Sequence, residues 1–344
     1  MEAIEFQRRE TPGLVSIIIP THRAERFIGA TLESISRQTY RHWEVIIVED
    51  GAPSSTRGIV AKFSRRHRWR RVDYSCNGQN RGAGYTRNVG FTKAGGQFVA
   101  LLDSDDRWTP DHLEASVKAL NESRKDIVYS TTLMVEDGTD LVLGAWGPHA
   151  GELKDFPQSL FARSFVTPSA SVMRRQVLAD VGPWSTTHRY CEDFDFWLRC
   201  VQAGKTFHYV GGCHCLYRKC HAGATTQRLC ATLEEVAETT ERYMNMQAPG
   251  LRPKTCRRYA AKAYMLAAKF HRSASPLHDP SADASRTPKL MLKSWRLQPK
   301  RFTSLLLGSW LGAVELFRVR RRPTTLALES APASETIQTT KRAA

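Results

Sequence analysis

The chain contains the run Phe98-Val99-Ala100-Leu101-Leu102-Asp103-Ser104-Asp105-Asp106, in which five apolar residues precede three carboxylates within four positions. A continuous apolar run of this length is typical of a strand that is buried on both faces of a parallel sheet. Open α/β sheets bind their ligands at the carboxyl ends of such strands. The run therefore predicts an α/β fold with acidic side chains at the ligand crevice, where carboxylates suit a hard divalent cation.

The same order of strand and polar loop occurs twice upstream of this run. Stretches 14–19 and 43–48 are rich in apolar, β-branched residues, and each is followed by a loop and by residues with helical spacing. Repeated units of this kind predict a right-handed parallel sheet. Because parallel strands end at one rim, we expect loops 20–25, 49–51 and 103–106 to meet there.

The composition restricts the class of protein. The 344 residues are 41% hydrophobic and 24% charged, with a formal charge of +16. These values indicate a soluble globular protein that binds anionic partners, which include phosphate groups, membrane surfaces and nucleic acids. The charged N-terminus lacks the apolar region of a secretory signal, so a cytoplasmic location with unpaired cysteines is expected. Cys213, Cys215 and Cys220 do not have a standard zinc spacing, and free thiols are the favoured interpretation.

The chain divides into five expected segments. An α/β domain covers 1–225, a helical extension 226–272, a linker rich in Ser and Pro 273–289, a basic amphipathic helical segment 290–322, and a disordered tail 323–344. The fourth segment contains an apolar helical face with basic flanks. It is either an interfacial helix on an anionic membrane or a helix packed on its own domain, and the second alternative is slightly favoured.

Five motifs follow one another along the first segment. They are Val15–Thr21, Val48–Gly51, Asn80–Gly82 with Arg87–Gly90, Leu102–Asp106, and Glu192-Asp193. In this order they resemble the family-2 glycosyltransferases over about residues 13–225, whereas any one of them alone is a weak signal. The resemblance implies a GT-A fold, which is a Rossmann-like, mostly parallel sheet flanked by helices. It also implies inverting transfer of a sugar from a nucleoside diphosphate to a hydroxyl acceptor, in cell-surface polysaccharide or glycolipid synthesis.

The resemblance also implies roles for individual residues. The donor-binding set is Pro20, Thr21, Glu25, Asp50, Arg87, Asn88, Asp103, Ser104 and Arg218. Asp105 and His221 are the implied ligands of Mg²⁺ or Mn²⁺, although His221 is alternatively a surface-loop histidine. A divalent ion stabilises the charge of a diphosphate leaving group. Asp106 is expected to be structural, and departures such as His22-Arg23 after Thr21 leave the donor's base and sugar open.

An inverting displacement needs a base that removes the proton of the acceptor hydroxyl. By the resemblance this base is Asp193, with Glu192 orienting or tuning it. Both acids open an expected helix whose apolar face includes Phe194 and Trp197, and a strand is predicted before it over 165–173. The alternative for both acids is plain stabilisation of a helix N-terminus, and the same alternative applies to the acids after Leu102.

Two other functions remain open at this stage. A nucleotidyltransferase that makes nucleotide sugars needs a Gly-rich phosphate loop, which the stretch Pro20-Thr21-His22-Arg23 lacks. A non-catalytic basic protein that binds nucleic acid or membrane predicts that the carboxylates are dispensable. The expected partners are a nucleotide sugar, a saccharide or lipid-linked glycan acceptor, and an anionic membrane surface at the inner face. Nucleic acid is not an expected partner.

Overall fold

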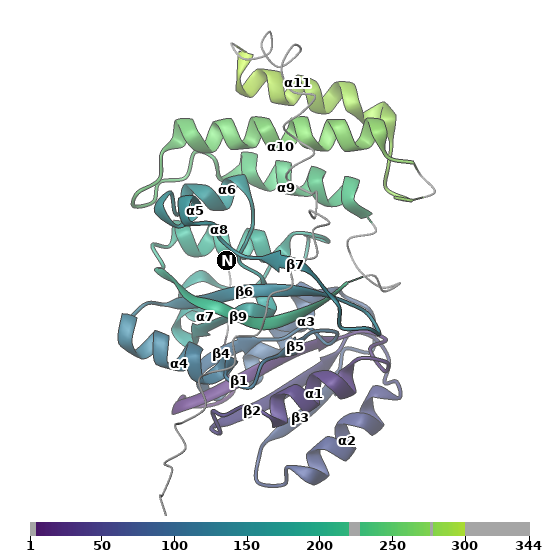
Figure 1. Ribbon diagram of the computed structural model, residues 1–344, viewed down its shortest axis with the longest axis vertical. Helices are drawn as coiled ribbons and strands as arrows, with labels where there is room; N and C mark the ends of the chain where they lie inside the picture. Colours follow the sequence, from purple (N-terminus) through teal and green to yellow (C-terminus); the bar gives the residue numbers. More distant parts are fainter. Residues whose placement is uncertain (1–4, 220–227, 276–277, 300–344) are drawn as a thin grey trace, which may run out of the picture.

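The computed structural model describes residues 5–219, 228–275 and 278–299, in which nine strands form one sheet (Figure 1). The strands are β1 Thr11–Thr21, β2 Trp43–Glu49, β3 Val72–Cys76, β4 Gly96–Leu101, β5 Arg107–Trp108, β6 Ile127–Glu136, β7 Val142–Trp146, β8 Ser171–Arg174 and β9 Phe207–Lys219. Their order is β3-β2-β1-β4-β8-β6-β9-β5, with β7 paired to β6. The first four are mutually parallel, as predicted, whereas β8 runs antiparallel to both its neighbours.

The register of the parallel strands sets the position of their polar loops. Thr21 of β1 lies opposite Glu49 of β2, and Ile18 lies opposite Leu101 of β4. Asp103 follows the end of β4 by two residues. The loops after these three strands therefore leave the sheet at one rim, which confirms the prediction from the sequence.

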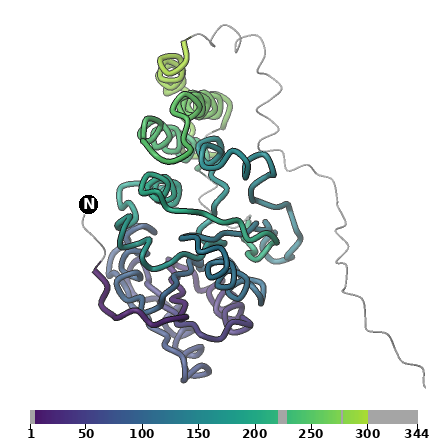
Figure 2. Tube along the Cα trace, turned by 90° about the vertical axis from the view of Figure 1, so that its left-hand side faces the viewer, coloured from purple at the N-terminus to yellow at the C-terminus, as the bar shows by residue number. Residues whose placement is uncertain are grey.

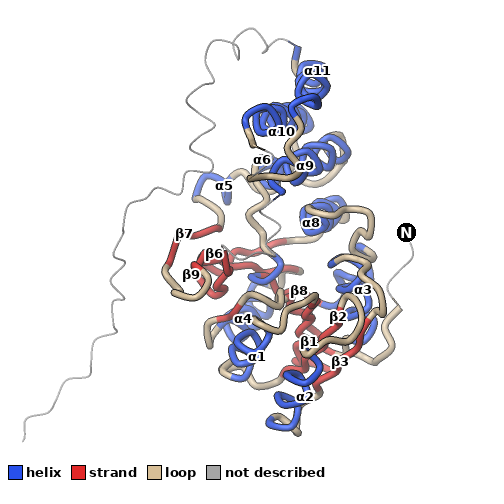
Figure 3. The backbone as a smooth tube through the Cα atoms, turned by 90° about the vertical axis from the view of Figure 1, so that its right-hand side faces the viewer, coloured by secondary structure: helices blue, strands red, loops and turns tan. Residues whose placement is uncertain are grey.

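Alternating side chains of β1 divide the core into two apolar clusters. Ile17 and Ile19 pack with helices α1 Ile28–Ser36, α2 Thr56–Arg66 and α4 His112–Ser123 on one face. Ile18 packs with α3 Ala83–Lys93, α7 Arg175–Val181 and α8 Glu192–Gln202 on the other, and Figure 3 shows α1 and α3 on opposite sides of the sheet. A Cβ at Gly90 would lie 2.6 Å from Ile18 Cγ2, so only glycine allows α3 to pack this closely.

The C-terminal helices form a layer beyond α8. They are α9 Leu229–Tyr243, α10 Pro253–Ser273 and α11 Thr287–Leu297, and the short helices α5 Ala150–Lys154 and α6 Gln158–Ala162 lie beside them. Figure 2 shows them in line at one end of the molecule. Buried residues of all three long helices belong to the same apolar cluster as α8, so this layer packs continuously on the α/β domain.

The expected segments fall as follows on the described residues. Helix α11 begins at Thr287, within the stretch 273–289 that the sequence predicts as a linker. A 3-10 helix at Ala284–Arg286 leads into it. Most of the basic segment 290–322 and all of the tail 323–344 lie outside the described residues.

Candidate active site

The three carboxylates after β4 have different surroundings. Asp103 is partly exposed and lies 2.6 Å from Arg87 Nη2. Asp106 is buried, and its Oδ1 accepts the backbone N–H of Arg218 at 3.2 Å. Burial, and then the charges of Asp105 and Asp103, raise the pKa of Asp106 well above its usual value. The run therefore consists of one buried acid, Asp106, and two partly exposed acids at the rim.

Arg87 of α3 connects these acids to the Glu-Asp pair. Its side chain is buried, and its second ion pair joins Nη1 to Glu192 Oε1 at 2.8 Å. The guanidinium also lies over the ring of Trp184, 4.7 Å from the centroid. Burial lowers the pKa of Arg87, but the carboxylates of Asp103 and Glu192 outweigh it and raise the pKa. A permanently charged arginine thus holds two acids from separate elements in one cluster.

Asp193 lies beside this cluster in the first turn of α8. Its Oδ1 accepts the N–H of Phe194 at 2.7 Å. Burial, and then the charge of Glu192, raise the pKa of Asp193 to about 7, although the Phe194 N–H and the charge of Arg87 lower it. A carboxylate with a pKa near neutrality is suited to accept and release a proton at physiological pH.

Asp50 organises the loop that enters α3. Its Oδ1 accepts the N–H of Arg81 at 2.7 Å, and its Oδ2 accepts the N–H of Gly82 at 2.8 Å. Gly82 has φ +89°, in the left-handed region that favours glycine. The N–H of Asp50 in turn donates to the carbonyl oxygen of Thr21 at 2.7 Å. The Thr21 hydroxyl is buried and has no hydrogen-bond partner among the described residues.

Arg218 of β9 fixes the backbone around the acids. Its Nε donates to the carbonyl oxygen of Asp105 at 3.1 Å, and its Nη1 donates to Asp137 at 3.0 Å. The guanidinium lies 5.2 Å from the ring centroid of Phe27. Arg218 therefore sets the path of the loop that carries Asp105.

Asn88 joins α3 to the loop before α8. Its Nδ2 donates to the carbonyl oxygen of Trp184 at 2.9 Å, and its Oδ1 accepts the N–H of Trp184 at 2.8 Å. A Cβ at Gly84 would lie only 2.1 Å from the carbonyl oxygen of Ser185, so α3 touches this loop directly. Trp184 is almost fully buried and stacks on Phe196, as a core residue does.

Comparison with known proteins identifies the family. The profile of glycosyl transferase family 2 matches residues 16–182. The glycosyltransferase TuaG of Bacillus subtilis, named for teichuronic acid biosynthesis, is 31% identical over 208 residues, which are 60% of this chain and 79% of TuaG. The chain belongs to glycosyl transferase family 2. The relative WfgD of Escherichia coli, a UDP-Glc:α-D-GlcNAc-diphosphoundecaprenol β-1,3-glucosyltransferase, is 29% identical over 54% of this glycosyltransferase and 68% of WfgD.

Two solved structures share the fold of this glycosyltransferase. Residues 1–349 of Staphylococcus aureus TarS, in complex with UDP, align with a TM-score of 0.60 and 19% identity over 85% of this chain and 82% of TarS 1–349. The mannosyltransferase PcManGT of Pyrobaculum calidifontis, in complex with GDP-Man and Mn²⁺, aligns with a TM-score of 0.55 and 18% identity over 87% and 90% of the two chains. This likeness confirms the GT-A fold expected from the sequence.

Most of the residues that the sequence predicts for the site lie along one rim of the glycosyltransferase. The ion pairs of Arg87 link Asp103 to Glu192, and Asp193 is adjacent. The backbone carbonyl of Ser104 accepts the Thr31 hydroxyl at 2.8 Å. Pro20 and Thr21 end β1, and Glu25 and Asp50 lie in the loops after β1 and β2. The amide of Asn88 instead faces the backbone of Trp184, and His221 lies outside the described residues.

Sequence reasoning missed several residues that support these acids. Ser169 accepts the N–H of Asp103 at 3.0 Å, and Asp137 holds Arg218. Tyr217 is partly buried, and burial, followed by the charges of Asp106, Asp105 and Asp103, raises its pKa. Each of these contacts joins residues more than sixty positions apart, so no local sequence pattern predicts it.

Proposed function

We propose that the enzyme transfers a sugar, with inversion, from a nucleoside diphosphate to a hydroxyl acceptor. The observation that carries the proposal is the double ion pair of Arg87, which holds Asp103 and Glu192 in one cluster beside Asp193. Donor-side and acceptor-side acids thereby meet at the carboxyl ends of the parallel strands, where α/β sheets bind their ligands.

On the donor side, we assign the nucleoside to the loops that carry Thr21 and Asp50, and the sugar and phosphates to Asp103, Arg87 and Arg218. The buried Thr21 hydroxyl, which has no partner among the described residues, supports this placement, because a ligand would satisfy it. Complexes of TarS with UDP and of PcManGT with GDP-Man, both on the same fold, support a nucleotide donor.

Asp105 is the carboxylate that we assign to Mg²⁺ or Mn²⁺. Asp105 is partly exposed at the rim beside Asp103, whereas Asp106 is buried against the backbone of Arg218. One or two carboxylates together with substrate phosphates are the usual protein environment of Mg²⁺. When bound, such an ion supplies stabilisation of the negative charge on the diphosphate. His221 is retained as a second proposed ligand.

On the acceptor side, Asp193 takes the proton of the hydroxyl as its oxygen forms a bond to the anomeric carbon of the sugar. The bond from this carbon to the diphosphate oxygen breaks, and its electron pair leaves with the diphosphate. Because attack and departure occur on opposite faces of the carbon, a single displacement inverts it. Burial, and then the charge of Glu192, keep the pKa of Asp193 high enough for proton transfer near neutral pH.

A panel of nucleotide sugars tests this assignment in the purified protein. We expect one donor to raise the melting temperature and to be turned over when Mn²⁺ is present. Asp105→Asn and Asp193→Asn should abolish turnover. Asp111→Asn is the control and should retain turnover. The Asp111 carboxylate accepts the Thr109 hydroxyl and lies 3.2 Å from His214 Nδ1. If no nucleotide sugar binds or reacts, or if both site variants stay active, the proposal is wrong.

We also propose a lipid-linked saccharide acceptor reached at the cytoplasmic face of the membrane. The named activities of TuaG and WfgD support an acceptor in cell-surface polysaccharide or glycolipid synthesis. None of the described helices is long and apolar enough to cross a membrane. Helix α11 exposes Leu292 and Trp295, with Lys289 and Arg296 beside them, which suits contact with an anionic surface.

Vesicle sedimentation tests the membrane contact. The protein should bind vesicles with anionic lipid more tightly than neutral vesicles, and Trp295→Ser should weaken this binding. Equal binding to both kinds of vesicle would argue against the contact without affecting the assignment of the active site.

A further inference from the structure

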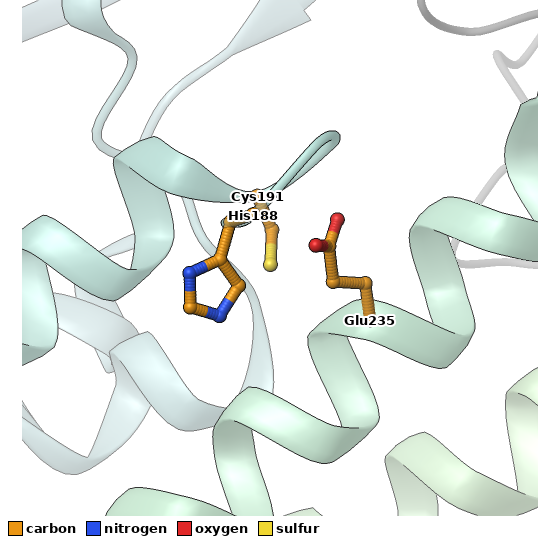
Figure 4. Close-up of side chains that lie close together, drawn as sticks. All are labelled: His188, Cys191 and Glu235. Carbon is orange, nitrogen blue, oxygen red and sulfur yellow. The ribbon is translucent and has the colours of Figure 1, made fainter. Parts of the chain in front are cut away.

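Three potential metal ligands converge next to the catalytic helix. His188 and Cys191 lie in the loop that leads into α8, and Glu235 projects from α9 (Figure 4). One ligand atom of each residue lies within 4.8 Å of the others. The group is separate from Asp105 and is not part of the donor site described above.

Each of the three side chains is oriented by a further contact. His188 Nδ1 lies 2.7 Å from Ser185 Oγ, which turns Nε2 towards α9. Nε2 and Cys191 Sγ both approach the hydroxyl of Thr239, at 3.2 and 3.4 Å. The imidazole and the thiol therefore both face α9 at Thr239, one turn after Glu235, and their ligand atoms lie within 4.8 Å of each other. Hydrogen bonding of the second ring nitrogen is the usual way in which proteins orient a metal-binding histidine.

The carboxylate of Glu235 is held in the same way. Its two oxygens accept the backbone N–H groups of Arg189 at 2.9 Å and Tyr190 at 2.7 Å. Carboxylates that bind metals are commonly hydrogen-bonded as well, because each oxygen has more than one lone pair. These two bonds fix Glu235 beside Cys191 and leave it able to bind an ion.

We propose that His188 Nε2, Cys191 Sγ and the carboxylate of Glu235 bind a zinc ion, with water in the fourth position. Imidazole, thiolate and carboxylate are all zinc ligands, whereas Mg²⁺ and Mn²⁺ favour oxygen. Binding replaces the proton of the Cys191 thiol by the metal and releases that proton to solvent.

The local charge favours a cation at this point. Burial, and further the carboxylates of Glu235, Asp193 and Glu192, raise the pKa of the Cys191 thiol. A divalent ion reverses this effect, since it stabilises the thiolate directly. The guanidinium of Arg242 is 3.4 Å from His188 Nε2, but its side chain is 58% exposed and can turn into solvent.

The proposed ion has a positioning role. Cys191 precedes Asp193 by two residues, and Glu235 belongs to the C-terminal helical layer. Zinc would therefore join α9 to the start of the helix that carries the proposed base. It touches neither donor nor acceptor in this account.

Metal analysis of the untagged protein, expressed in zinc-supplemented medium and purified by gel filtration, tests the proposal. Wild type should contain about one zinc per chain, because one site is proposed in each chain. Cys191→Ser and Glu235→Gln should lose it. Cys200→Ser, which changes a buried thiol within α8, should retain it. In Glu235→Gln the side-chain amide oxygen can still accept a backbone N–H, so that variant separates metal binding from folding.

Cobalt substitution and chelation give readouts that do not depend on activity. Cobalt-loaded wild type should show thiolate-to-cobalt charge-transfer absorption, and Cys191→Ser should lack it. Chelation should lower the melting temperature of wild type and Cys200→Ser but leave that of Glu235→Gln unchanged. A metal-free wild type, or zinc that persists in both site variants, would overturn the proposal and leave a hydrogen-bonded cluster only.

Discussion

The substitution Asp193→Asn separates the proposed role of this acid from a structural one. We expect it to reduce transfer strongly and, at pH 8, to stabilise the fold. In the folded protein the pKa of Asp193 is raised from 3.8 to about 7, mainly by burial. The folded state therefore holds this proton more tightly than the unfolded chain. Ionisation lowers stability progressively as the pH rises from about 4 to about 7, and the penalty is constant above that range.

The size of the effect follows from the two pKa values. At about 1.4 kcal/mol for each tenfold change, the gap between a pKa of 3.8 and one of about 7 corresponds to at most about 4.5 kcal/mol. Asp193 is partly exposed, so solvent screening reduces this to about 1–2 kcal/mol. Asparagine cannot ionise, and its side-chain oxygen can still accept the N–H of Phe194. Relative to wild type, the free energy of unfolding of Asp193→Asn should thus be higher by this amount at pH 8 and the same at pH 4.

Urea unfolding at pH 4 and pH 8, together with donor turnover, measures both effects. Loss of a general base should reduce turnover by about 10²–10⁴-fold. Asp195→Asn is the matched control on α8, because Asp195 pairs with Arg199 at 2.9 Å and accepts the Tyr243 hydroxyl at 2.8 Å. It should destabilise the protein. If Asp193→Asn is destabilising at pH 8, or retains most of the activity, the reasoning is refuted.

Four further results are expected. Below about pH 7, kcat/KM should fall about tenfold per pH unit as Asp193 is protonated, and a flat pH profile would exclude it as the base. Arg87→Met should lower the free energy of unfolding, measured in urea, by about 3–5 kcal/mol, because the carboxylates of Asp103 and Glu192 lose their partner. An unchanged free energy of unfolding would contradict a stabilising role for these ion pairs. Gly84→Ala should lower the free energy of unfolding by about 1–3 kcal/mol, because the new Cβ clashes with the Ser185 carbonyl oxygen. Gly58→Ala, which places a Cβ in open space on α2, should leave the free energy of unfolding unchanged or raise it slightly. Chelation of divalent ions should stop donor turnover and added Mn²⁺ should restore it, and turnover that persists after chelation would contradict the assignment of a metal to Asp105.

The parallel half of the sheet was predictable because its signal is local. Runs such as Ile17–Ile19 are buried on both faces, and their composition alone indicates central parallel strands. Once the strands are parallel, the rim position of Asp50 and Asp103 follows from topology. The expected α/β class and the family membership are both confirmed on this basis.

The remainder depends on contacts between distant parts of the chain. The predicted strand over 165–173 is confined to Ser171–Arg174, because Pro168 begins a 3-10 turn. That turn places Ser169 where it accepts the N–H of Asp103. Similarly, the pairing of Arg87 with Glu192 spans 105 residues and has no local signature. Asp103 and Glu192 could be identified as candidate site residues from the sequence, but their shared contact with Arg87 is visible only in the fold.

The most direct test of the account is the anomeric configuration of the sugar released when water replaces the acceptor. Proton NMR of the first product, recorded before the free sugar equilibrates, measures it without knowledge of the acceptor. We predict the configuration opposite to that of the donor, and no release by Asp193→Asn even when that variant still binds the donor. Retained configuration, or unchanged release by the variant, would contradict the single displacement with Asp193 as base.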